Sequence, residues 1–372
     1  MTKPTSIERD PLYVVAPPIV TDKTKRFGHI IVWGTFTLMF LLAIIQFLNT
    51  NEHITFGFKT WRPVLYAYIL WACAIGYSRV LIYGEKGKRT LFVFPAVMFI
   101  LSIVIFPMLF GLYISFTDWN LSSIDGREFN GLDNFYQMIS DPYYWNALKN
   151  MIYYVLAVLV EFAIAFLLAL LLNSQIRGRK FFRIAFLIPL MLSPVAVSWM
   201  VGKSMLEQRF GPVANLGRFL GWETPTFFSS PEIARLTMMC MDAWTFIPLM
   251  IIMLLAGLQA LPKEVLEAAK VDGANKWTMF KNIIFPIMLP VSLTTLVIRI
   301  IFKLKLADII IIVTAGGPGG ATDSVTSFIV REYRDRSNVG YGTLLSFVYL
   351  ILIIIFMTIL IRFVNRWLQR AA

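Results

Sequence analysis

The sequence has few charged residues for its length. Only 15% of its 372 residues are Asp, Glu, Lys or Arg, while 58% are hydrophobic. Soluble domains average about 25% charged and about 45–50% apolar residues. Water cannot solvate such a chain as a compact globule, so the composition excludes a soluble protein and predicts an integral membrane protein.

Histidine and cysteine are almost absent. The two histidines, His29 and His53, are far apart and form no metal motif. Cys73 and Cys240 each lie within an apolar stretch, so a structural disulfide is not expected. A membrane enzyme would need clustered catalytic His, Cys or carboxylate residues. The sequence therefore disfavours an enzyme and predicts no metal site.

A phosphate-binding loop of the form G-x-x-x-x-G-K-[ST] is also lacking. The nearest segment has Ile82 where the first glycine belongs and Arg89 where Ser or Thr belongs, and we interpret it as a basic loop. We therefore expect this chain to bind no nucleotide through such a loop and to hold no cofactor.

What the sequence does have is repeated apolar stretches of about 20 residues, which favour membrane helices over the short alternating strands of a barrel. They predict an all-α polytopic membrane protein with about eight transmembrane helices. The expected spans are 28–48, 62–83, 91–116, 146–172, 182–204, 234–258, 284–313 and 341–363.

The net charge of +12 would suggest a nucleic-acid partner in a soluble protein, but here it fits basic cytoplasmic loops. If the N-terminus is cytoplasmic, the cytoplasmic segments hold nearly twice as many Lys and Arg residues as the outer ones. The charge distribution therefore predicts both termini inside, the lipid bilayer as partner and no nucleic acid.

The polar stretch 259–285 is then cytoplasmic, and it predicts a helix-turn-helix that projects from the membrane. Pro262 suits the first turn of a helix, and Gly273 can adopt the positive φ that ends one. Asn275 is a candidate N-cap for a second short helix. Glu267 with the small Ala268 and Ala269 would form a surface that another protein can approach closely, so we expect a docking element.

The predicted helix 284–313 contains four ionisable residues, which are costly at membrane depth. Arg299 and Lys303 are spaced i,i+4 on one face, and Lys305 and Asp308 are spaced i,i+3 and are expected to form an ion pair.

Glu161 is a candidate counter-charge for Arg299 and Lys303 from another helix. Two alternatives stay open for these residues: they line a cavity that favours hydroxyl-rich or anionic solutes, or they form a buried bridge without solute contact. Asp242, in a different helix, is interpreted as structural.

The glycine-rich segment 314–322, with Gly316, Gly317 and Pro318, follows a membrane helix on the outer face. A phosphate loop would need a strand before it and a helix after it, so we interpret this segment as a structural turn.

Several of these segments together resemble one family. Glu267-Ala268-Ala269, Gly273, Ile283 and Phe285-Pro286 have the order and spacing of the cytoplasmic signature of the permease subunits of bacterial ABC importers for carbohydrates, of the maltose and glycerol-3-phosphate type. Phe285 replaces the usual Leu. The resemblance extends over most of the chain from about residue 91. Further similar segments are Ser115-Phe116-Thr117-Asp118-Trp119, Gly131-Leu132-Asp133-Asn134-Phe135, Asp242-Ala243-Trp244 and Thr314 with Gly316-Gly317-Pro318.

The resemblance implies a type I ABC importer transmembrane fold in the bacterial cytoplasmic membrane. It implies a cytoplasmic tail 1–27, two extra membrane helices in 28–84, a six-helix core in 85–366 with the coupling loop 259–285, and a C-terminal tail 367–372. The expected partners are a second permease subunit in a pseudo-symmetric heterodimer, two copies of an ATP-binding subunit and an extracytoplasmic solute-binding protein.

The resemblance also assigns residues. ATPase coupling is expected at Glu267, Ala268, Ala269, Asp272 and Gly273, and the substrate path at Arg299, Lys303, Leu306 and Glu161. The expected function is import of a sugar or sugar derivative, driven by ATP hydrolysis on the docked subunit, with ATP-Mg bound there. The alternative is an ion-coupled secondary transporter of a small polar solute, although no clear inverted repeat is visible.

Overall fold

The computed structural model describes residues 21–50, 54–124 and 126–371 and divides the chain into two compact units, Met1–Phe110 and Gly111–Ala372. The described residues contain no strand, and their only β-type pairings are two isolated bridges. The predicted all-α class is therefore confirmed. Most of the predicted tail 1–27, and the end of the predicted tail 367–372, lie outside the described residues.

The first unit is built on an antiparallel pair of helices, α1 (Asp22–Thr50) and α2 (Arg62–Tyr83), followed by α3 (Glu85–Ile100). A π-helical turn, η1 (Leu101–Ile105), joins α3 to α4 (Phe106–Ile114), which continues into the second unit. The buried amide of Gln46 bonds the backbone N–H and carbonyl of Phe58, which fixes the connection between α1 and α2. Most other side chains here are apolar and exposed, as expected of helices that face lipid.

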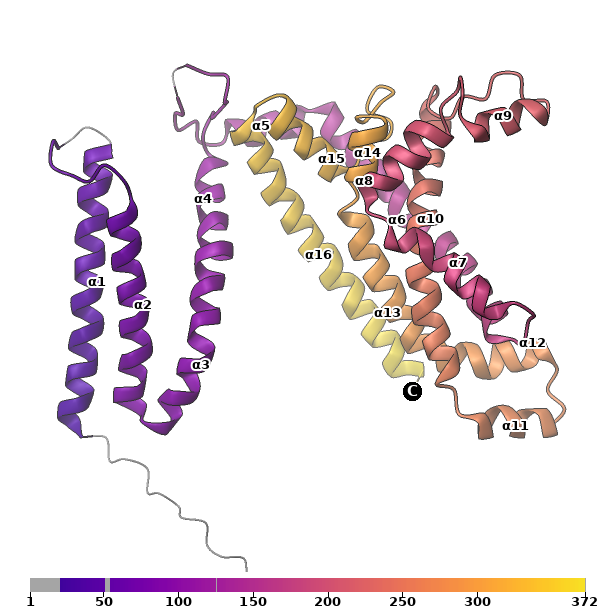
Figure 1. The fold of residues 1–372 in the computed structure, drawn as a ribbon, viewed down its shortest axis with the longest axis horizontal. Helices are drawn as coiled ribbons and strands as arrows, with labels where there is room; N and C mark the ends of the chain where they lie inside the picture. Colours follow the sequence, from indigo (N-terminus) through magenta and orange to yellow (C-terminus); the bar gives the residue numbers. More distant parts are fainter. Residues whose placement is uncertain (1–20, 51–53, 125, 372) are drawn as a thin grey trace, which may run out of the picture. The chain divides into compact units, whose positions relative to one another are not determined.

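The second unit is centred on three helices that pack on one another, α6, α10 and α13 (Figure 1). N-caps with a following proline set two of their starts: Asp141 precedes Pro142 in α6, and Ser230 precedes Pro231 in α10. The helices of this unit are α5 (Asp133–Ser140), α6 (Pro142–Asn173), α7 (Arg179–Met191), α8 (Pro194–Val197), η2 (Ser198–Met205), α9 (Pro212–Phe219), α10 (Pro231–Gln259), α11 (Lys263–Val271), α12 (Lys276–Met279), η3 (Phe280–Ile284), α13 (Phe285–Leu304), α14 (Asp308–Val313), α15 (Val325–Val330), η4 (Arg331–Asp335) and α16 (Val339–Ala371).

Six helices of the described chain are long and apolar enough to cross a membrane: α1, α2, α3 continued through α4, α6, α10 and α16. The predicted span 182–204 is instead a bent pair, α7 followed by α8 and η2, with 98° between its halves, and it would make a seventh. The break comes at Leu192 and Ser193, before Pro194, where the residue preceding a proline avoids the helical region. The count of eight is therefore not confirmed.

The predicted helix 284–313 is also interrupted. α13 ends at Leu304, and α14 begins at Asp308. Lys305 (φ −97°, ψ 7°) and Ala307 (φ −148°, ψ −48°) leave helical geometry, so the break separates Lys305, at the end of α13, from Asp308, at the start of α14.

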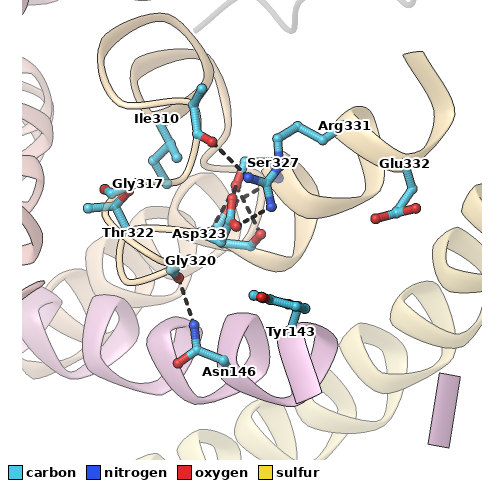
Figure 2. Close-up of polar contacts among 12 residues, drawn as sticks. Tyr143, Asn146, Ile310, Gly317, Gly320, Thr322, Asp323, Ser327, Arg331 and Glu332 are labelled. Atoms are coloured by element: carbon cyan, nitrogen blue, oxygen red, sulfur yellow. Dashed lines mark hydrogen bonds and ion pairs between the residues drawn. The ribbon is translucent and has the colours of Figure 1, made fainter. Parts of the chain in front are cut away.

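The glycine-rich segment forms a tight turn between α14 and α15 that is bonded to α6 (Figure 2). The Gly320 carbonyl accepts from Asn146 Nδ2 at 2.7 Å and from Asn150 Nδ2 at 3.0 Å. Gly316 has φ +86°, and a Cβ there would lie 2.4 Å from Asp323 Oδ1, so no side chain fits without movement. Gly317 and Pro318 lie in the same turn and are joined by a cis peptide.

Asp323 organises the end of this turn (Figure 2). It is buried, it accepts from Ser327 Oγ at 3.0 Å, and it is paired with Arg331, whose Nη1 also donates to the Ala315 carbonyl at 2.7 Å. Burial raises the pKa of Asp323 to about 6, although Arg331 and Ser327 act in the opposite direction.

This raised pKa predicts a pH-dependent stability. The pKa of Asp323 is about 6 in the folded protein and 3.8 ordinarily. The protonated carboxyl therefore adds to the free energy of unfolding, fully below about pH 4, and this contribution is lost as the pH rises through about 6. A shift of this size corresponds to about 3 kcal/mol. The thermal unfolding midpoint in detergent should therefore fall more steeply between pH 4 and pH 7 in the wild type than in Asp323→Asn.

Asp335→Asn serves as the control, because a hydrogen bond from Arg334 lowers the pKa of that carboxylate. Equal pH slopes for the wild type and Asp323→Asn would contradict the prediction.

Candidate functional site

Four charged side chains from three helices meet in the interior of the second unit. Glu161 comes from α6, Asp242 from α10, and Arg299 and Lys303 from α13. Arg299 and Lys303 are 0% exposed, and both carboxylates are buried as well. We call these four residues the charge cluster.

Each carboxylate of the charge cluster bonds both cations. Glu161 accepts from Arg299 Nε and from Lys303 Nζ, at 2.7 Å in each case. Asp242 Oδ2 accepts from Arg299 Nη2 and from Lys303 Nζ. Two cations and two anions give the cluster no formal net charge. The Arg299 guanidinium also lies 4.6 Å from the centre of the Phe246 ring.

The helical spacing and the burial explain this arrangement together. The i,i+4 spacing puts Arg299 and Lys303 on one face of α13, towards α6 and α10. An unpaired buried charge costs several kcal/mol, and removing one partner of a buried pair destabilises a protein by about 3–5 kcal/mol. The charge cluster therefore holds the three central helices in one relative position. One donor, Arg299 Nη1, is buried and has no hydrogen-bond partner in the described part of the chain.

Of the two alternatives for Arg299 and Lys303, the structure forms the bridge to Glu161. Sequence reasoning did not pair Asp242 with these cations, although an acidic residue within an apolar helix is a signal for such a partner. Contact of these residues with a substrate stays a prediction.

The predicted Lys305–Asp308 ion pair is wrong, since none of the ion pairs among the described residues joins them. The break between α13 and α14 removes the i,i+3 geometry on which that prediction depended. Leu306, in this break, is buried, and its carbonyl accepts a hydrogen bond from Ser324.

The second candidate site is the hairpin of α11 and α12, which projects from the bundle at the end where α7 begins and α16 ends (Figure 1). α11 ends in a Schellman motif: Ala274 N–H donates to the Ala269 carbonyl at 2.9 Å, and Gly273 N–H donates to the Lys270 carbonyl at 3.1 Å. Gly273 has φ +79°, which favours glycine.

The two helices of the hairpin begin at residues that the sequence predicted to different accuracy. Pro262 is the N-cap residue of α11 and precedes its first turn, so it lies one position earlier than expected. Asn275 caps α12 by accepting from Thr278 N–H at 2.8 Å, which confirms that prediction.

Most of the predicted coupling residues are on the surface of this hairpin. Glu267, Ala268, Asp272 and Gly273 are exposed. Ala269 is buried, so it does not contribute to the small-residue surface expected beside Ala268. Sequence reasoning missed two large apolar groups on the hairpin, Val271 and Trp277, which are 87% and 68% exposed.

The base of the hairpin is fixed to the bundle by apolar contacts. Leu261, Leu266 and Phe280 pack with a buried cluster formed by α6, α10 and α13. The Phe280 ring stacks on Trp277 with centroids 5.8 Å apart and contacts the Phe166 ring edge-to-face at 5.8 Å. A continuous set of packed rings therefore connects the hairpin to α6 and, through Phe285, to the start of α13.

Within the described part of the chain, no three His, Cys, Asp or Glu side chains are grouped so that they could hold a metal ion. The arrangement consists of a rigid charged core and an exposed hairpin linked by packed side chains.

Residues 11–371 match the family described as binding-protein-dependent transport system inner membrane component. The trehalose/maltose transport system permease protein MalF of Thermococcus litoralis is 30% identical over 275 residues, which is 74% of this chain and 92% of that protein. The sulfoquinovosyl glycerol transport system permease protein SmoG of Agrobacterium fabrum is 30% identical over 273 residues, 73% of this chain and 88% of that protein.

A solved structure gives an independent comparison of the fold. A chain of a bacterial alginate ABC transporter, crystallised with its alginate pentasaccharide-bound periplasmic protein, matches with a TM-score of 0.63. The match covers 84% of this chain and 98% of that chain at 22% identity, so it shows the fold. The chain therefore belongs to the family of inner membrane components of binding-protein-dependent transport systems.

Proposed function

We propose that this chain is the permease subunit of an ABC importer that moves a sugar or sugar derivative across the cytoplasmic membrane. Membership of the family is the observation that carries the proposal. The relatives are named for trehalose or maltose and for sulfoquinovosyl glycerol, which supports a carbohydrate substrate. The chain itself would perform no catalysis, and both termini would be cytoplasmic.

The assembly would contain a second permease subunit, two copies of an ATP-binding subunit that holds ATP-Mg, and an extracytoplasmic solute-binding protein. The exposed hairpin supports docking of the ATPase. Val271 and Trp277 present apolar surface that burial in a partner would remove from water, at about 25 cal/mol per Å². Glu267 takes part in no ion pair among the described residues, so its charge is available to a basic partner residue.

Motion of the docked ATPase would reach the membrane helices through the packed rings. Displacement of Trp277 would shift Phe280, and Phe280 contacts both α6 and the start of α13. These helices carry Glu161, Arg299 and Lys303, so the charge cluster would move as one body with them.

The proposed substrate path runs beside Arg299, Lys303, Leu306 and Glu161. The cations are matched by two carboxylates, so the charge cluster offers no excess positive charge to an anionic substrate. Arg299 Nη1, which has no hydrogen-bond partner among the described residues, is a donor suited to a sugar hydroxyl. These features favour a hydroxyl-rich substrate.

The docking proposal predicts that Gly273→Asp separates ATP hydrolysis from uptake. A non-glycine residue at φ +79° costs about 1 kcal/mol or more, and the change alters the turn that shapes the docking surface. ATP-driven sugar uptake by the assembled transporter in proteoliposomes should fall at least about tenfold, while the chain remains in the membrane.

Gly221→Asp is the matched control, because Gly221 also has a positive φ (+94°) with open space around its Cβ but lies outside the hairpin. Wild-type uptake by Gly273→Asp would refute the docking role of this turn.

The charge cluster generates a separate prediction on stability. Glu161→Gln should lower the free energy of unfolding by about 3–5 kcal/mol, because it leaves two buried cations facing Asp242 alone. Combining it with Lys303→Met restores a one-to-one pairing of Arg299 with Asp242 and should recover part of that loss.

Denaturant or thermal unfolding in detergent measures both variants. Lys305→Met is the control, since this lysine is exposed and should change stability by less than about 0.5 kcal/mol. A double variant no more stable than Glu161→Gln would show that charge balance is not what holds the cluster.

A further inference from the structure

A groove is lined by residues of α7 and α10, which pack on each other, and by Leu172 of α6. Figure 1 shows that α10 leads into the hairpin at its lower end. Its volume is about 210 Å³, and most of its lining is apolar, including Leu187, Ile252 and Leu255. Gln259, the last residue of α10, and Arg183 of α7 are its polar side chains. The groove is therefore mainly apolar and has one cationic side chain in its lining.

One edge of the Arg183 guanidinium is left bare by the described residues. Its Nε and Nη2 atoms are buried, and neither has a hydrogen-bond partner among the described residues. None of the ion pairs of the described chain includes Arg183, in contrast to Arg299 and Lys303 of the charge cluster. Buried polar groups are almost always bonded, and a buried charge without a counter-charge costs several kcal/mol. Arg183 itself is half-buried, and an anion would satisfy this bare edge of its guanidinium.

The surrounding charge also favours an anion. Arg177, Arg179 and Lys180 lie just before Arg183, at the start of α7, and no acidic residue lies in the first turn of that helix. The start of a helix carries a partial positive charge, which adds to these cations. The lining of the groove contains no carboxylate that could balance them.

We propose that this groove binds one anionic phospholipid, with its phosphate on Arg183 and an acyl chain along Leu187, Ile252 and Leu255. Nε and Nη2 form one edge of the guanidinium, and two parallel donors match two phosphate oxygens in a bidentate contact. The groove lies at the end of a membrane-spanning helix, α10, where lipid phosphates occur. Basic pockets between membrane helices are a recognised setting for anionic headgroups.

The apolar lining favours a lipid over a free anion. Inorganic phosphate on Arg183 would leave the apolar walls of the groove uncovered, whereas an acyl chain removes them from water at the same time. The bound lipid would also contact Gln259, one residue from the connection that leads into α11. The lipid composition of the bilayer would thus decide whether the groove next to the base of the hairpin is occupied.

Lipid titration of the purified full chain tests this site. Binding of phosphatidylglycerol and phosphatidylcholine with the same acyl chains would be measured in a neutral detergent by native mass spectrometry. We expect the wild type to prefer phosphatidylglycerol, and Arg183→Gln to lower its affinity for that lipid about tenfold, as expected for loss of a charge-assisted bond. Its affinity for phosphatidylcholine should fall less, because the choline cation already offsets the charge of that phosphate.

Two further variants separate charge from shape. Lys180→Gln removes an exposed cation from the same helix but not from the groove, so it should keep the preference for phosphatidylglycerol. Ile252→Trp fills the groove and keeps Arg183, so it should weaken both lipids, while any binding of inorganic phosphate should persist.

The site is overturned if Arg183→Gln, shown to be folded by circular dichroism, keeps the wild-type lipid preference. It is also overturned if inorganic phosphate displaces phosphatidylglycerol at equal concentration, since the occupant would then be a free anion. Sugar uptake does not enter either readout, so the transport proposal can fail or hold independently of this site.

Discussion

A low-dielectric interior tolerates ionised side chains only when opposite charges pair with them. This constraint determines how the central helices of the second unit are arranged. Glu161, Asp242, Arg299 and Lys303 satisfy it as a closed set, with each carboxylate bonded to both cations. Because the four residues come from α6, α10 and α13, electrostatic pairing fixes the relative position of helices that apolar packing alone would allow to slide.

The hairpin of α11 and α12 depends on that fixed centre. Leu261, Leu266 and Phe280 need a stable apolar surface to pack against, and α6, α10 and α13 provide it. The base of the hairpin is continuous with the core through packed aromatic rings, as transmission of force from the proposed docked partner would need. The exposed tip with Val271 and Trp277 can therefore be specialised for a partner while the base remains part of the bundle.

The sequence predicted the helical class, the family and the turn chemistry of the hairpin, because hydropathy, capping residues and the glycine at a positive φ are local signals. The charge cluster was only partly predictable. Helical spacing places Arg299 and Lys303 on one face of α13, but the contact of Asp242 with them depends on how α10 packs. The failed Lys305–Asp308 pair and the interrupted helix have the same origin, since composition gives no sign of the break after Leu304. The burial of Ala269 and the bare nitrogens of Arg183 could also not be predicted, because both depend on which residues pack around them in the tertiary structure.

The neutrality of the charge cluster has an electrical consequence. Moving a charge through the transmembrane potential involves work of about 2.3 kcal/mol per elementary charge at 100 mV, but a set with no net charge that moves together involves almost none. Two buried cations and two buried anions can therefore shift with α6, α10 and α13 without sensing the membrane voltage. If the hairpin docks an ATPase as proposed, the central helices would respond to that partner rather than to the resting potential of the cell.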